Sequence, residues 1–196
     1  MPSVKSLRSI CSGVALAFAI GAPSAQASLI ADFQGVTDSF DFNYSLKFST
    51  PVGGNAEQLV SGDFITIYDF GGFTGLGGVV LPAFITASTS FLGPNPPFQG
   101  APDSASIPNV TFTYTGAPIT VDTNFLVSIH TTSGTAITGF YSGQTTNNFD
   151  QPGAKLGNTG QTMVPTTIPE PETYAMMLAG LGLMGFVARR RKQKAA

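Results

Sequence analysis

Thiols, tryptophan and histidine are nearly absent from this sequence of 196 residues, which contains one cysteine, one histidine and no tryptophan. The cysteine, Cys11, lies in an apolar run near the N-terminus, so the rest of the chain has no thiol for a disulfide. Its stability must therefore come from an apolar core. A zinc site needs several histidine or cysteine ligands, and His130 alone does not supply them. The sequence predicts no metal site, no cofactor and no catalytic residue.

Positive charge is scarce between residues 28 and 168, where arginine is missing and only Lys47 and Lys155 are cationic. Nine carboxylates in the same region give it a net charge of −7. An acidic surface repels phosphate backbones and anionic lipids, which excludes nucleic acid as a partner. The composition is suited to a domain that stays soluble outside the cell.

The N-terminus has the pattern of a secretory signal peptide. Lys5 and Arg8 give a positive start, an apolar run comes next over 10–20, and a small-x-small site lies after it. These parts, in this order, are typical of a segment that signal peptidase removes. We predict a helical signal peptide over residues 1–27. The predicted cleavage site consists of Ala25, Ala27 and Ser28.

The C-terminal segment has three parts in order: a Pro-Glu-Pro motif, an apolar run and a cationic cluster. The apolar run over 174–188 has 15 residues. As a helix it would span about 23 Å, which is short of the roughly 30 Å hydrocarbon core. We therefore expect a short transmembrane helix that anchors the chain weakly, with a cytoplasmic C-terminus. The motif residues are Pro169, Glu170 and Pro171, and the cluster consists of Arg189, Arg190, Arg191 and Lys192.

This arrangement resembles the PEP-CTERM sorting signal, and we assign residues 169–196 to such a tail. The resemblance implies an exosortase, a membrane transpeptidase-like enzyme of Gram-negative bacteria, that recognises the tail at the inner membrane and cuts it near the Pro-Glu-Pro motif. It implies transient anchoring, followed by a place at the cell surface or outside the cell. Hosts of this family typically make exopolysaccharide and biofilm matrix. The tail is also labelled after ice-binding proteins that carry it, but a sorting tail does not define the function of its cargo.

Strand periodicity dominates the region between the two ends. Over residues 38–48, apolar side chains occupy the positions 40, 42, 44, 46 and 48 and polar ones lie between them. Such alternation is typical of a strand with one buried and one solvated face. The same pattern occurs over 110–114 and 119–129, and we expect these segments to form a hairpin across the turn at 116–118. Residues 63–70, 79–86 and 136–141 are further strand candidates.

Short strands separated by glycine- and proline-rich clusters predict an all-β fold, an antiparallel β-sandwich over residues 28–144. The prolines of the segment 92–97 cannot donate to a sheet, so we expect an exposed loop there. Over residues 145–168 the composition turns to Asn, Gln, Gly, Thr and Pro with few apolar residues. We predict a flexible linker over 145–168 that joins the domain to its tail.

Few side chains of the central domain are suited to catalysis. Ser128 and His130 share a polar strand face, but residues two apart on a strand lie about 7 Å from each other, too far for a direct nucleophile–base hydrogen bond. Two carboxylate pairs are left, which fit turn positions, calcium ligands or the acid and base of a glycosidase. These pairs are Asp38 with Asp41, and Asp63 with Asp69.

Two functions from different classes fit these observations. The leading one is a non-enzymatic cell-surface or extracellular-matrix protein that engages exopolysaccharide or neighbouring proteins. The alternative is a small secreted carbohydrate-active enzyme on a β-sandwich fold. The expected partners are signal peptidase, an exosortase, the membrane through the C-terminal helix, and exopolysaccharide.

Overall fold

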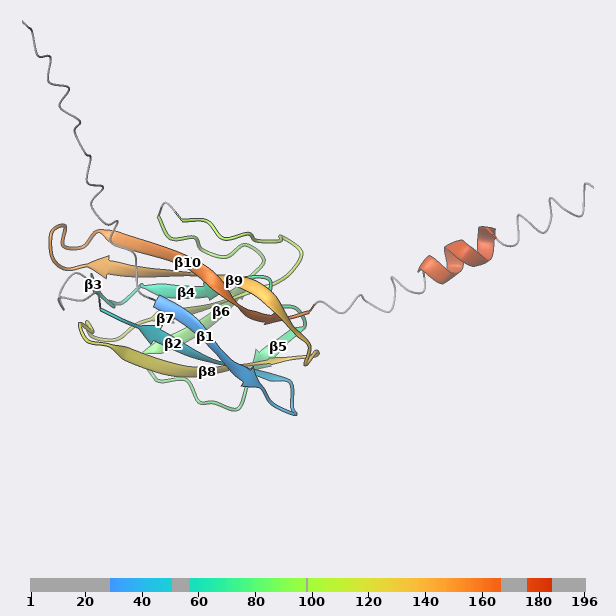
Figure 1. The fold of residues 1–196 in the computed structure, drawn as a ribbon, viewed down its shortest axis with the longest axis horizontal. Helices are drawn as coiled ribbons and strands as arrows, with labels where there is room; N and C mark the ends of the chain where they lie inside the picture. Colours follow the sequence, from blue (N-terminus) through green and yellow to red (C-terminus); the bar gives the residue numbers. More distant parts are fainter. Residues whose placement is uncertain (1–28, 51–56, 98, 167–175, 185–196) are drawn as a thin grey trace, which may run out of the picture.

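The computed structural model describes residues 29–50, 57–97, 99–166 and 176–184. These ranges contain ten β-strands and one short helix, over 176–184. All strand pairs are antiparallel and belong to two sheets. The sheets face each other across a common core, so the predicted all-β antiparallel sandwich is confirmed (Figure 1).

The strand order is set mostly by pairs of strands that are distant in the sequence. Sheet A has the order β1-β2-β8-β5, and sheet B has the order β10-β9-β4-β7-β6, with β3 also paired to β9. The strands of sheet A are β1 (Leu29–Val36), β2 (Asp41–Phe48), β8 (Thr123–Thr131) and β5 (Phe73–Leu76). Those of sheet B are β3 (Glu57–Gln58), β4 (Phe64–Ile67), β6 (Ile85–Ser90), β7 (Asn109–Tyr114), β9 (Ala136–Asn147) and β10 (Lys155–Pro165).

The predicted buried face of the segment 38–48 is confirmed from Phe42 onward. Its residues Phe42, Tyr44, Leu46 and Phe48 are each at most 2% exposed. Phe40 departs from the pattern, because the strand begins only at Asp41. Phe40 lies in the β1–β2 turn with a φ of 60°, and 46% of its surface is exposed.

Aromatic side chains make up the part of the core between β2 and the β4–β5 connection. The ring of Phe70 lies 5.7 Å from that of Phe42 and 6.4 Å from that of Tyr44, and Phe33 lies 5.7 Å from both. Tilted and edge-on ring pairs at these distances add to the free energy gained from burial. Aromatic packing of this kind stabilises a domain whose sequence has no thiol.

The predicted hairpin between 110–114 and 119–129 is wrong. β7 belongs to sheet B, where it pairs with β4 and β6, whereas β8 belongs to sheet A, where it pairs with β2 and β5. The turn at 116–118 therefore lies on a connection between the two sheets. Strands of both sheets bury one face against the same core, so alternation alone does not indicate which strands pair.

The predicted linker over 145–168 is also wrong for the part that the structure describes. β9 continues to Asn147, and β10 pairs with it at eleven successive positions, from Lys155 to Pro165. The inner side of β10 buries the polar residues Asn158 and Thr162 together with Val164. Backbone pairing and buried polar side chains thus form a strand that the low apolar content of this segment did not indicate. The described domain ends at Thr166, whose N–H donates to Thr135 O.

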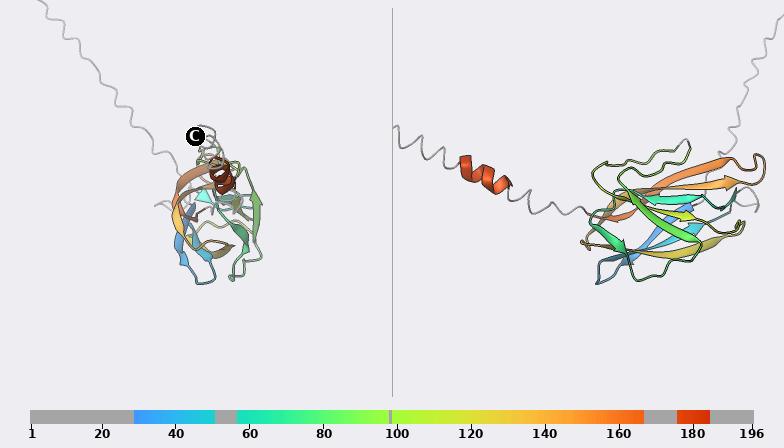
Figure 2. Two further views of the ribbon diagram at one scale, coloured as in Figure 1. Left: turned by 90° about the vertical axis from the view of Figure 1, so that its right-hand side faces the viewer. Right: turned by 180° about the vertical axis from the view of Figure 1, so that it is seen from behind.

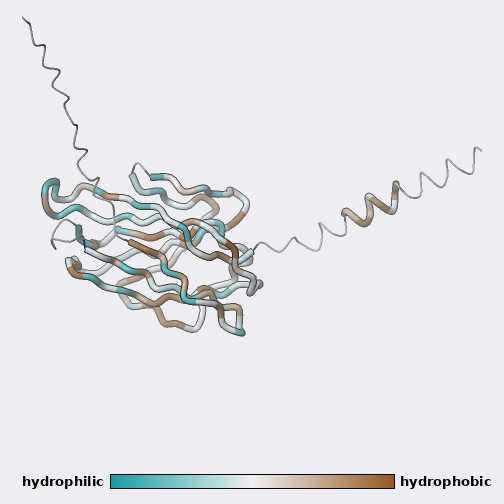
Figure 3. The backbone as a smooth tube through the Cα atoms, in the orientation of Figure 1, coloured by the Kyte–Doolittle hydropathy of each residue, from teal (hydrophilic) through white to brown (hydrophobic). Residues whose placement is uncertain are grey.

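Two loops between strands of the sandwich differ from expectation. The candidate strand 79–86 is a loop up to residue 84. Figure 3 colours this loop as apolar, and the side chain of Val80 in it is 89% exposed. The proline-rich segment 92–97 is exposed at Pro94, as predicted, but Pro96 is buried. A β-carbon at Gly157 would lie 2.6 Å from Pro96, so this loop covers the outer face of sheet B.

Several predicted segments lie outside the described residues. These are the signal peptide over 1–27, the Pro-Glu-Pro motif and the cationic cluster together with the residues after it. The individual residues concerned are Ala25, Ala27, Ser28, Pro169, Glu170, Pro171, Arg189, Arg190, Arg191 and Lys192. Of the predicted transmembrane segment, the structure describes the helix over 176–184. Within the described ranges, no helix has both the length and the apolar character required to cross a membrane.

Candidate functional site

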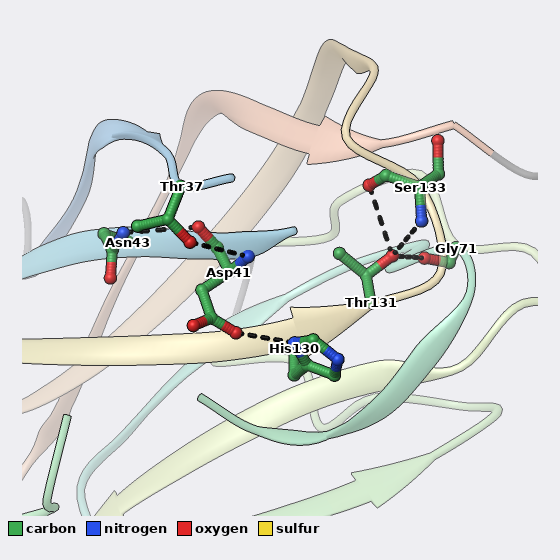
Figure 4. Close-up of polar contacts among 7 residues, drawn as sticks. All are labelled: Thr37, Asp41, Asn43, Gly71, His130, Thr131 and Ser133. Carbon is green, nitrogen blue, oxygen red and sulfur yellow. Dashed lines mark hydrogen bonds and ion pairs between the residues drawn. The ribbon is translucent and has the colours of Figure 1, made fainter. Parts of the chain in front are cut away.

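The only histidine of the chain forms a pair with an aspartate on the outer face of sheet A. Asp41 of β2 and His130 of β8 occupy directly opposite positions in the strand register. His130 Nδ1 lies 2.6 Å from Asp41 Oδ1, and the two side chains are 44% and 18% exposed (Figure 4). Because a carboxylate only accepts hydrogen bonds, Nδ1 is the donor, and Nε2 is left as the acceptor of the neutral ring.

Neighbouring groups hold Asp41 at the start of β2. The backbone N–H of Asp41 donates to Thr37 Oγ1 at 3.2 Å, and Asn43 Nδ2 donates to the carbonyl of Asp41 at 3.2 Å (Figure 4). The turn before Asp41 is closed by the N–H of Phe40, which donates to Thr37 O. These bonds hold the backbone of Asp41, from which the carboxylate reaches His130 of β8.

The end of β8 after the histidine is held by a second set of hydrogen bonds. Thr131 Oγ1 donates to Gly71 O at 3.1 Å and accepts from the N–H of Ser133 at 3.1 Å (Figure 4). Gly71 belongs to the turn before β5, so these bonds join that turn to the end of β8. β8, which carries His130, is therefore held by β2 on one side and by the turn before β5 on the other.

Ser128, two residues before the histidine, is 2% exposed and contacts the end of β5. The N–H of Gly77 donates to Ser128 O at 2.8 Å. A β-carbon at Gly77 would lie 2.1 Å from Ser128 Oγ and 3.0 Å from Asp41 Oδ1, so only glycine fits there. In the described part of the chain, no hydrogen bond joins Ser128 to His130, and the serine is covered by backbone.

The predicted carboxylate pairs have separate surroundings in the structure. Asp41 binds His130, whereas Asp38 lies in the β1–β2 turn. Asp63 is fully buried and accepts hydrogen bonds from Lys155 Nζ at 2.8 Å and from Thr146 Oγ1 at 3.0 Å. Among the described residues, no group of three or more acidic, histidine or cysteine side chains is arranged to hold a metal ion.

Asp69 and Asp103 hold the long loop between β6 and β7 against sheet B. Asp69 Oδ1 accepts from the N–H of Ser104 at 2.8 Å, and Asp103 accepts from Asn109 Nδ2 at 2.9 Å. Tyr68 contacts the same loop, with its hydroxyl 2.8 Å from Pro94 O. Burial raises the pKa of Tyr68. These carboxylates thus position a loop, and each of them contacts different backbone and amide groups.

Sequence reasoning placed His130 correctly on a polar strand face but missed its partner. Asp41 and His130 are 89 residues apart in the sequence. Their pairing depends on the β2–β8 register, which no local pattern indicates. The pair of buried Asp63 with Lys155 was missed for a similar reason, because Asp63 directly precedes β4 and Lys155 begins β10, far away in the sequence.

The sole histidine allows a direct test of the hydrogen-bond geometry. We expect the neutral imidazole of His130 to carry its proton on Nδ1, because Asp41 accepts from that atom. Two-bond proton–nitrogen NMR correlations of the neutral ring distinguish the two tautomers. Replacing Asp41 by alanine should shift the population toward the Nε2–H form. An unchanged tautomer in that variant would contradict the pair.

The protein belongs to the class of β-sandwich proteins, and a short C-terminal segment follows the sandwich in the sequence. Residues 167–192 of that segment match the PEP-CTERM protein-sorting motif. The chain thus carries a PEP-CTERM sorting motif, which supports an exported surface protein that an exosortase processes at the membrane. No match to a curated protein accompanies this motif. The match covers both the Pro-Glu-Pro motif and the cationic cluster.

Proposed function

We propose that this protein is a non-catalytic structural or binding component of the cell surface or extracellular matrix in a Gram-negative bacterium that makes exopolysaccharide. The observation that carries the proposal is the sorting motif at residues 167–192, placed behind an acidic domain without thiols. In this proposal, a signal peptide over 1–27 directs export, and the tail holds the chain in the inner membrane until the exosortase acts. The sandwich then binds exopolysaccharide or neighbouring matrix proteins.

The surroundings of the carboxylates support binding over catalysis. A glycosidase needs two carboxyl groups that face each other across the bond to be broken. Asp63 is instead buried against Lys155, and Asp69 accepts from the backbone of Ser104. Both aspartates therefore have structural partners of their own.

One observation favours the second candidate, a secreted carbohydrate-active enzyme. The pair of His130 and Asp41 leaves an imidazole nitrogen available on a side chain that is 44% exposed. General acid–base catalysis uses groups of this kind.

Incubation with the exopolysaccharide of the host distinguishes the two candidates. Retention of the protein on the polymer without shorter fragments would support the binding role. If fragments are released by the unsubstituted protein but not by His130→Ala, the binding role is wrong and the protein is a carbohydrate-active enzyme. If the protein is not retained and no fragments are released, a passive structural role is left.

Processing at both ends is expected to be visible in one mass spectrum. Protein recovered from the cell exterior should begin at Ser28 and lack residues 189–196, because the signal peptide and the sorting tail are both removed during export. Replacing Pro169, Glu170 and Pro171 by alanine should abolish release and leave the chain at the inner membrane. Intact-mass analysis and fractionation measure both outcomes. Release of the substituted chain in normal amounts would contradict the role of the motif.

A further inference from the structure

A groove runs along the side of the sandwich where the edge strands of the two sheets meet. β1 is the edge of sheet A and β10 is the edge of sheet B, and the two lie on the same side of the domain (Figures 1 and 2). Between them is an open groove of about 370 Å³. This volume lies within the range of about 300–1,000 Å³ that is typical of small-ligand sites. We call it the seam groove; its lining includes Ile30, Asp32, Phe33, Thr138, Gln161 and Met163.

The lining of the seam groove combines apolar and polar side chains. Ile30 contributes an aliphatic side chain that is 40% exposed. The ring of Phe33 is held in place by Phe42 and Tyr44, each 5.7 Å away. Hydroxyl and amide groups come from Thr138 and Gln161 on the other side. Such a surface offers both an apolar contact and hydrogen bonds to one ligand.

The charge in this lining is already neutralised. Lys47 Nζ forms an ion pair with Asp32, and Gln34 Nε2 donates to the same carboxylate at 2.9 Å. The hydrogen bond from Lys47 lowers the pKa of Asp32. The carboxylate is therefore oriented and paired, so it contributes a fixed acceptor and little net charge.

Thr162 gives an independent sign of a ligand. It is 6% exposed and lies in the lining of the seam groove. Its hydroxyl has no hydrogen-bond partner among the described residues. A buried hydroxyl without a partner is unfavourable, and a ligand with its own polar groups would satisfy it.

We propose that the seam groove binds a neutral segment of an extracellular polysaccharide. This inference rests on the proposed function and adds the site and the ligand class. A sugar ring has an apolar face for Ile30 and Phe33 and a rim of hydroxyl groups for Gln161 and the other polar side chains. An extended peptide fits less well, because two edge carbonyls already accept side-chain hydrogen bonds. These carbonyls are Leu29 O, which accepts from Asn158 Nδ2, and Met163 O, which accepts from the Tyr44 hydroxyl, each at 2.6 Å.

Substitutions at the groove test the site, with the purified exopolysaccharide of the producing strain as the probe. We expect Ile30→Glu and Gln161→Ala to weaken retention of the exported protein in affinity electrophoresis by about tenfold, the effect of losing about 1.4 kcal/mol of binding free energy. Leu126→Glu and Gln151→Ala are the matched controls, because both side chains are exposed and lie outside the lining. The controls should be retained like the unsubstituted protein.

Thr162→Val separates a binding role from a structural one. Valine keeps the shape and removes the hydroxyl that has no described partner, so we expect unchanged or higher resistance to urea together with weaker retention. Equal retention of the unsubstituted protein and of all groove variants would show that the polysaccharide does not bind in the seam groove. Binding would then take place at another surface of the protein. Loss of retention in the controls as well would overturn the seam groove too. If the unsubstituted protein were not retained, both the groove and the binding role would be wrong.

Discussion

Replacing Lys155 by methionine is expected to destabilise the domain by about 3 kcal/mol at neutral pH, since removal of one partner leaves a buried charge uncompensated. Asp63 is fully buried and receives hydrogen bonds from Lys155 Nζ, from Thr146 Oγ1 and from the N–H of Val60. Lys155 also donates to Thr146 Oγ1 at 2.7 Å, so its loss removes two contacts at once. Urea unfolding of the two proteins, followed by circular dichroism, measures the difference.

The other lysine of the domain provides the matched control. Lys47 forms an ion pair with Asp32 at the surface, where the two side chains are 45% and 40% exposed. Exposed ion pairs contribute about 0–1 kcal/mol, so Lys47→Met should change the free energy of unfolding by less than about 1 kcal/mol. Equal effects of the two substitutions would mean that the burial of Asp63 has no energetic consequence.

The sequence was most informative where a local pattern has one physical cause. Alternation in β2 arises because one face of the strand is buried. As predicted, that face carries Phe42, Tyr44, Leu46 and Phe48. The pattern says nothing about the partner of a strand. β7 and β8 both alternate but belong to different sheets, so the predicted hairpin was wrong although both strands exist.

The candidate site could not be predicted, because each of its pairs depends on the register of distant strands. Asp41 meets His130 across β2 and β8, and Asp63 meets Lys155 over a separation of 92 residues. The seam groove depends in addition on two edge strands, one of which the sequence had indicated as a linker. The sorting motif, by contrast, is local and linear, so its residues could be named from the sequence alone.

Deleting β10 is expected to abolish the cooperative fold. A fragment of residues 28–145, one residue longer than the domain predicted from the sequence, lacks all eleven positions of β10 that pair with β9. It also loses Val164 from the core and leaves Asp63 without Lys155. Since domains are stable by only about 5–15 kcal/mol, the combined loss exceeds what the remaining strands can tolerate.

A fragment of residues 28–166 is expected to keep the fold, because Thr166 is the last residue before position 167 that the structure describes, and its N–H donates to Thr135 O of the sandwich. Its far-ultraviolet circular dichroism should be of the β type, and urea should unfold it in one transition that a reductant does not affect. A third fragment, residues 28–154, keeps β9 complete and lacks β10 and the C-terminal segment. It should behave like the shortest fragment, which would assign the loss to β10 and not to the end of β9. Cooperative unfolding of residues 28–145 at the same urea concentration as residues 28–166 would show instead that β10 is dispensable for the fold.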